Sequence, residues 1–169
     1  GIFKNVIFLN YIPELEKFAF WAQQLIAESL GKNKKGFLPV ISNVPKDHHS
    51  LLQLYLDGPK DKLFNIFYTK FQSKIKIKSK NIDKKINFIN NKNLSTVKNA
   101  QKNALINVIK KNKIPHREFS LKKFDENTIG QLFAYFIIET VIIGEISEIN
   151  PFNQPAVEEI KILTKKFLR

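Results

Sequence analysis

Cysteine is absent from the chain, and arginine nearly so, with Arg117 and Arg169 the only two. Without cysteine, neither a disulfide framework nor a thiolate metal site can form, which fits a reducing compartment and a cytoplasmic protein. Only three histidines are present. His48 and His49 are neighbours whose side chains point in different directions, so we expect no zinc or other metal site.

Long hydrophobic runs are missing as well. The longest extends from Phe133 to Ile143 and is interrupted by Glu139, and it is far shorter than the ~20 residues that cross a bilayer. Lys4 is followed by a short strand-like run and not by the apolar region of a signal peptide. We therefore predict no membrane partner.

Lysine supplies nearly all the basic residues and gives a net charge of +13. A nucleic-acid-binding protein would be expected to use arginine for paired contacts with phosphate and guanine, so this excess does not indicate base recognition. Lys, Asn, Ile and Phe are abundant together, as in proteins from A- and T-rich genomes, and the lysines are scattered along the chain. We expect no nucleic-acid partner, although a positive field would favour an anionic substrate such as a sugar phosphate.

Strand-like and helical segments alternate along the chain, whose 169 residues suffice for one domain. This alternation predicts right-handed βαβ units and an α/β fold, a three-layer αβα sandwich with a mainly parallel sheet. We expect strands at 6–11, 36–41, 63–68 and 116–121. We expect helices at 13–29, 47–56, 95–112 and 128–143, and one that opens near 154. Ligands of such sheets bind beyond the carboxyl ends of the strands, where we expect the chemistry.

Two further segments carry structural expectations. Residues 74–78 alternate lysine with isoleucine, which predicts an exposed sheet edge protected by charge. The helix at 128–143 is so apolar that we expect it to be buried on most sides, with Asp125 or Asn127 as its cap.

The segment QQLIAESLGK offers a first candidate site. Gln24 and Glu28 are one helical turn apart, and Glu28 falls roughly 100° from the centre of the apolar stripe of its helix. That position is the boundary between core and surface, where a carboxylate can be partly removed from water and accept a proton. A solvated glutamate near a helix end is the structural alternative.

The segment KDHHSLLQLYLDG offers a second. A histidine in the first turn of a helix is kept neutral by the positive end of the helix dipole and can then both donate and accept a hydrogen bond. His48 and His49 are the candidates, and a plain surface or capping role is the alternative.

The segment GEISEINPFNQPAVEEIK offers a third. Gln154 and Lys161 are seven residues apart, which is two helical turns, so they lie about 20° apart around the helix and can present an amide and an ammonium to one anion. Lys161 is again at the border of an apolar face, formed by Val157, Ile160, Leu163 and Phe167.

Taken together, these segments resemble the motifs of glucose-6-phosphate isomerase, in the same order and with plausible separations. QQxxxES is similar to the segment that holds the family's base, HSLLQLYLDGP to its histidine segment and NPFNQPAVEEIK to its C-terminal signature. The resemblance covers nearly the whole chain. It implies catalytic roles for Glu28, His49 and Lys161 and substrate contacts for Gln24 and Gln154.

The implied reaction is the interconversion of glucose 6-phosphate and fructose 6-phosphate. In the family, His49 with Lys161 would move a proton as the sugar ring opens, and Glu28 would carry a proton between C2 and C1 through a cis-enediol. No cofactor or metal is needed, because one carboxylate can remove and return the proton, as in the handling of a triose phosphate by a glutamate base.

The resemblance also implies that part of the family enzyme is missing. Its N-terminal domain, with the Ser/Thr-rich phosphate loop and an arginine for the enediolate, has no counterpart here, so residues 1–169 are expected to form a single C-terminal sugar-isomerase-type domain. The family forms a homodimer with shared sites, so we expect this fragment to be inactive alone. A non-catalytic sugar-phosphate-binding module and a basic nucleic-acid-binding domain are the alternatives.

Overall fold

The structure, a computed structural model, describes residues 3–70, 73–79 and 82–169. Its centre is one sheet in the order β2-β1-β3-β4, in which every neighbouring pair is parallel. The strands are β1 (Asn5–Asn10), β2 (Leu38–Asn43), β3 (Lys62–Thr69) and β4 (His116–Leu121).

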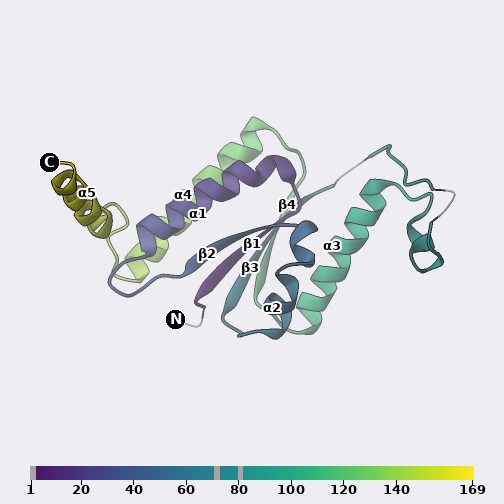
Figure 1. The fold of residues 1–169 in the computed structure, drawn as a ribbon, viewed down its shortest axis with the longest axis horizontal. Coiled ribbons are helices and arrows are strands. Elements are labelled where there is room, and N and C mark those ends of the chain that lie inside the picture. The colour runs from purple at the N-terminus through teal and green to yellow at the C-terminus, as the bar shows by residue number, and fades with distance from the viewer. Residues whose placement is uncertain (1–2, 71–72, 80–81) are drawn as a thin grey trace.

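Helices form a layer on each side of this sheet (Figure 1). α1 (Glu16–Leu30) and α4 (Glu126–Ile146) cover one face, and α2 (Leu52–Asp57) and α3 (Leu94–Lys111) cover the other. The predicted α/β class, with a parallel sheet between two helical layers, is confirmed.

Alternation along the central strand β1 supplies both cores. Val6 and Phe8 point toward α1 and α4, whereas Ile7 and Leu9 point toward α2 and α3, and all four are almost fully buried. Successive side chains of a strand face opposite sides of the sheet, so a strand covered on both faces is apolar throughout. For this reason the run at 6–11 forms a strand although its residues do not alternate between apolar and polar.

The predicted segments correspond to observed elements, with local differences. The helix predicted at 13–29 begins as a 3₁₀ turn, Pro13–Leu15, before α1. The helix predicted at 47–56 is split into a 3₁₀ turn, Lys46–His48, and the short α2. Asp125 caps α4 as predicted, because its carboxylate accepts a hydrogen bond from the backbone N–H of Thr128 at 2.9 Å.

The prediction of a sheet edge at 74–78 is wrong. Only one isolated antiparallel bridge, between Lys76 and Asn93, forms there in the part of the chain that the structure describes. The lysines of this segment are exposed on a projection that leaves the sheet after β3. The segment bonds to residues 91–94 and not to the sheet, since the N–H of Ile77 bonds to the carbonyl of Lys92 and the N–H of Leu94 to that of Ile75.

The prediction that α4 is buried on most sides is also wrong. The helix is buried along one line of residues at four-residue spacing, Leu132, Phe136, Thr140 and Gly144. Its other side exposes large apolar side chains, namely Tyr135, Ile137, Ile138, Val141, Ile142 and Ile146. The helix therefore has more apolar surface than this domain alone covers.

By length and composition, α4 would also be able to cross a membrane. Only 22% of its most apolar window is buried inside the domain. The 21 residues of this helix extend well beyond the apolar run at 133–143 that the sequence offers. One such helix is weak evidence for a membrane segment, since core helices of soluble proteins have the same length and composition.

Aromatic rings hold α1 and α4 against the sheet. Phe136 is fully buried, and its ring centroid lies 5.7 Å from those of Phe8, Phe18 and Phe119. Such spacing is typical of favourable ring pairs. Each of these rings comes from a different element, so Phe136 joins α4 to α1, β1 and β4 at one point.

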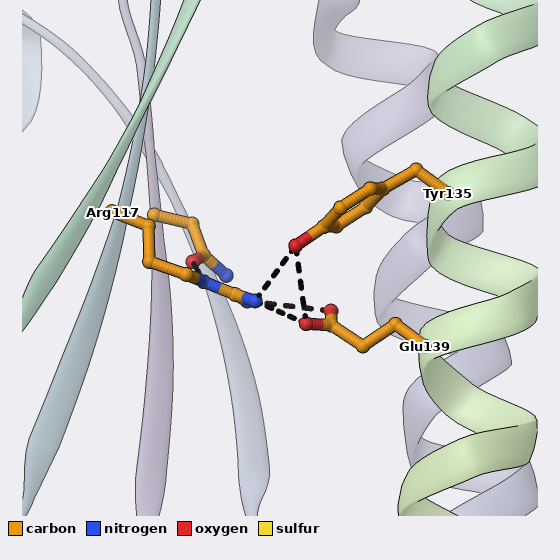
Figure 2. Close-up of polar contacts among 4 residues, drawn as sticks. Arg117, Tyr135 and Glu139 are labelled. Carbon is orange, nitrogen blue, oxygen red and sulfur yellow. Dashed lines mark hydrogen bonds and ion pairs between the residues drawn. The ribbon is translucent and has the colours of Figure 1, made fainter.

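An ion pair adds a directional contact between α4 and the sheet (Figure 2). Arg117 on β4 donates two guanidinium hydrogen bonds to Glu139 on α4, a third to the hydroxyl of Tyr135 at 3.2 Å, and its Nε–H to Asn65 Oδ1 at 2.8 Å. Asn65 is fully buried. A paired guanidinium of this kind fixes orientation as well as distance.

We predict that Glu139→Gln lowers the free energy of unfolding by about 1–3 kcal/mol, because the side chain of Arg117 is only 32% exposed and its guanidinium would lose its counter-charge. Urea denaturation measures the change. Glu158→Gln is the matched control: its partner Lys161 and Glu158 are 61% and 59% exposed, and we expect a change within about 0.5 kcal/mol. Equal effects from the two substitutions would contradict a structural role for the Arg117 pair.

Candidate functional site

The carboxylate of Glu28 is held by two side-chain amides. Gln24, one turn earlier on α1, donates to Glu28 Oε1 at 3.0 Å, and Gln154 donates to Glu28 Oε2 at 2.8 Å across 126 residues of sequence. Glu28 is half-buried at the boundary of its helix, where the sequence predicts it. Two of the three segments singled out in the sequence therefore meet at one carboxylate.

A tight turn at the end of α4 brings Gln154 to this position. The backbone N–H of Ile149 bonds to the carbonyl of Gly144 at 2.8 Å, and the side chain of Asn150 accepts from the N–H of Phe152 at 2.9 Å. A Cβ at residue 144 would lie 3.1 Å from the carbonyl of Ile149 and 3.3 Å from Pro151. Glycine at this position thus lets the turn fold closely back over α4.

Two lysines fasten the turn to the end of α1. Lys32 donates to the carbonyl of Asn150 at 2.6 Å, and Lys35 donates to that of Ser147 at 2.8 Å. Both belong to the loop that joins α1 to β2, in which Asn33 and Lys34 adopt the left-handed conformation, with φ of 53° and 59°. The loop thereby curls toward α4 and links α1 to the segment that carries Gln154.

A cavity of about 490 Å³ opens between these parts. Glu28 and Gln154 line it together with the loop lysines and the first turn of α5 (Pro155–Phe167). Volumes of this size are typical of small-ligand sites. The cavity combines one carboxylate, two amides and three ammonium groups, which suits an anionic ligand.

Lys161 does not reach this carboxylate in the structure. It donates to Glu158 on the same helix at 2.5 Å and is 61% exposed. All of α5 is exposed, and the helix extends past the ends of α1 and α4, away from the sheet (Figure 1). The apolar face at whose border Lys161 was expected is formed by the residues predicted, but nothing in the described chain covers it.

His49 lies at the opposite end of the strands, beyond their carboxyl ends. Glu28 precedes the loop that enters β2 at Leu38, whereas His49 follows the end of β2 at Asn43. The six residues of β2 alone span roughly 17 Å at about 3.3 Å per residue. Glu28 and His49 of one chain are therefore on opposite sides of the domain, and only the histidine is at the carboxyl edge where we expected all the chemistry.

The two adjacent histidines have different surroundings. His49 is exposed, whereas His48 is half-buried and its Nε2 lies 3.0 Å from the hydroxyl of Tyr11. Burial, followed by the nearby His49, lowers the pKa of His48, while Asp47 opposes this. A neutral imidazole was expected here because of a helix dipole, but the main cause is burial, since α2 begins only at Leu52.

Sequence reasoning missed several residues of these sites. Lys32 and Lys35 stand in a lysine-rich loop where their individual roles cannot be distinguished by composition. Tyr11 reads as the last apolar residue of a strand. His48 and Tyr11 are 37 residues apart in sequence, and no local spacing predicts a contact over such a distance.

The fold and this site define a class: a three-layer parallel α/β domain with an amide-held carboxylate beside a cavity at its helix ends. No protein-family model matches the chain. Its sequence is 34% identical to glucose-6-phosphate isomerase of Methanocaldococcus jannaschii over 96% of this chain and 40% of that protein. It is 40% identical to the probable glucose-6-phosphate isomerase of Methanococcus maripaludis over 90% of this chain and 34% of that protein.

Solved structures share the fold of this chain. A crystal structure of a hypothetical protein from Thermus thermophilus has a TM-score of 0.87 at 27% identity and matches 98% of this chain and 41% of its own. A glucose-6-phosphate isomerase from Chlamydia trachomatis has a TM-score of 0.73 at 16% identity, matching 98% of this chain and 35% of its own, and shares the fold. The chain is thus homologous to these glucose-6-phosphate isomerases over nearly its whole length, and it spans between about a third and two fifths of the length of the curated relatives.

We predict that replacing Lys32 and Lys35 together by glutamine loosens the turn at 147–152. The backbone amides of Ile149 and Phe152 should exchange with deuterium roughly fivefold faster, the equivalent of about 1 kcal/mol for the two lost contacts. Hydrogen-exchange mass spectrometry or NMR measures this. Lys34→Gln is the control, since no hydrogen bond or ion pair of Lys34 is found among the described residues; a similar acceleration in that variant would show that the two contacts are unimportant.

Proposed function

We propose that the chain is the C-terminal catalytic domain of an aldose-ketose isomerase that interconverts glucose 6-phosphate and fructose 6-phosphate. The observation that carries the proposal is the carboxylate of Glu28, held by Gln24 and Gln154 at the wall of the 490 Å³ cavity. The relatives named glucose-6-phosphate isomerase support the choice of substrate.

Glu28 is the base in this proposal. It takes the proton from C2 of the open-chain aldose while the C2–H electron pair forms the C1=C2 bond and the carbonyl oxygen at C1 gains a proton. The product of this step is a cis-enediol. Glu28 then returns its proton to C1, where the C1=C2 electron pair forms the new C–H bond. The hydroxyl at C2 releases one proton, which balances the one gained at the C1 oxygen, and becomes the ketone, so the carboxylate ends as it began.

The electrons never leave the sugar. C2 is oxidised from alcohol to ketone and C1 is reduced from aldehyde to alcohol within one molecule, so the step requires no external electron carrier. The amides of Gln24 and Gln154 fix the plane of the carboxylate, which holds an oxygen near the C1–C2 unit for both transfers. In this role the glutamines position the base and contact the substrate.

Ring opening precedes proton transfer and is assigned to His49 with Lys161. At near-neutral pH an imidazole can donate a proton to the ring oxygen and accept one from the hydroxyl at C1. Neither residue lies at Glu28 within one chain, because Lys161 pairs with Glu158 and His49 lies at the opposite edge of the sheet. The complete site therefore needs parts that one copy of this domain does not bring together.

We infer that the complete protein is a homodimer in which His49 serves the neighbouring subunit's site. The separation by the length of β2 supports this arrangement. The uncovered apolar faces of α4 and α5 support a larger assembly too, since contiguous exposed apolar patches mark interaction surfaces. One copy of the chain alone is then inactive, because its His49 cannot serve its own Glu28.

The first test is Glu28→Gln in the complete protein. We expect isomerisation to fall by about 10²–10⁴-fold, because the amide cannot accept the C2 proton. Ring opening should persist, measured as the enzyme-dependent exchange between α and β glucose 6-phosphate by NMR. Glu159→Gln, an exposed glutamate on α5, is the control and should retain turnover; normal isomerisation by the Glu28 variant would show that another group is the base.

The second test mixes inactive subunits. Chains carrying Glu28→Gln and chains carrying His49→Ala are unfolded together in equal amounts and refolded. If each site combines Glu28 of one subunit with His49 of the other, mixed dimers have one intact site, and about a quarter of normal activity returns. Activity that stays at the level of the separate variants would contradict the shared site.

A further inference from the structure

In the loop between β2 and α2, the side chain of His48 contacts the core, whereas that of its neighbour His49 is exposed. Tyr11, directly after β1, is only 4% exposed, and its hydroxyl lies 3.0 Å from His48 Nε2. The two rings are nearly perpendicular, with an interplanar angle of 76° and centroids 5.9 Å apart. His48 is thus held both by a hydrogen bond and by packing against a buried ring.

The direction of this hydrogen bond is defined by the environment. Burial raises the pKa of the Tyr11 hydroxyl far above its usual value, so the group keeps its proton and donates. Burial also lowers the pKa of His48, which favours the neutral ring with Nε2 as the acceptor. The proton of the neutral ring is then on Nδ1.

Other contacts make the loop rigid on either side of His48. Asp47 Oδ2 accepts from the backbone N–H of Asn43 at 2.8 Å, and Asp47 Oδ1 accepts from the hydroxyl of Ser50 at 3.3 Å. The backbone N–H of His49 bonds to the carbonyl of Lys46 at 3.2 Å. The backbone of His49 is therefore held on both sides, and its exposed imidazole projects from a fixed base.

We propose that Tyr11 and His48 form a positioning pair that presents His49 to the substrate. This inference rests on the proposed function, in which the imidazole of His49 opens the sugar ring. It assigns separate tasks to the two adjacent histidines: His48 anchors the loop on Tyr11, and His49 carries out the proton transfer.

Proton transfer at the sugar ring is sensitive to small displacements of the imidazole. A misplacement of about 1 Å can reduce the rate on the order of 10²-fold. Tyr11→Phe keeps the buried ring and removes only the hydroxyl. We expect kcat of the complete protein to fall about tenfold, with little change in KM, because the loop loses its anchor while the substrate contacts remain.

The decisive measurement is a double-mutant cycle of Tyr11→Phe with His49→Ala in the complete protein. If Tyr11 acts through His49, the hydroxyl no longer matters once the imidazole is gone, and the double variant should have the same kcat as His49→Ala alone. Tyr55→Phe is the matched control. It also removes a buried tyrosine hydroxyl, which lies 3.0 Å from Ser42 Oγ within the core, and it should leave kcat unchanged.

The outcomes separate this inference from the proposed function. Normal turnover of His49→Ala would overturn both, since no catalytic imidazole would remain to be positioned. A large loss in His49→Ala together with normal kcat in Tyr11→Phe, or equal losses for Tyr11→Phe with and without His49, would overturn the positioning pair alone. His48→Leu removes the same contact from its other end and should reproduce the loss of Tyr11→Phe; full activity in that variant would also refute the pair.

Discussion

The packing of α4 against the sheet is the contact on which the rest of the domain depends. Phe136 fills the centre of the face shared by α1, β1 and β4, and Arg117 joins the buried Asn65 to Glu139. A parallel sheet must be covered on both faces, so without α4 half of one face would be open to water. Because α4 ends where α1 ends, its packing also delivers the turn at 147–152 and with it the amide of Gln154.

Local sequence was enough to predict the layers of the fold, whereas a common site for two of the segments was implied only by the family resemblance. Fully apolar runs such as Val6–Leu9 predict central strands because both of their faces are covered, and Asp125 predicts a helix start because its side chain can bond the first free N–H. The matching motifs around Glu28 and Gln154 indicate one site. Their contact depends on the closeness of the turn over Gly144.

Other features could not be derived from sequence because they depend on pairings between distant elements. The exposed side of α4 has the same composition as its buried side, so apolar content alone cannot reveal which side is covered. Arg117 and Glu139 stand 22 residues apart on a strand and a helix, and no helical or strand period relates them. Lys161 was assigned a boundary position from an apolar face that this domain does not bury, since the amphipathic pattern of α5 does not specify what covers it.

The cavity beside Glu28 is electrically polarised. It is lined by the carboxyl end of α1 and the first turn of α5, and helix ends of these two kinds carry about half a negative and half a positive elementary charge. Lys32, Lys34 and Lys35 offset the negative end, and Glu28 is the single acidic residue among the described residues of the lining. A ligand with one charged end therefore experiences a torque in this field, which turns its anionic group toward the lysines and α5 and its uncharged end toward the carboxylate. The field can orient a ligand before any specific contact forms.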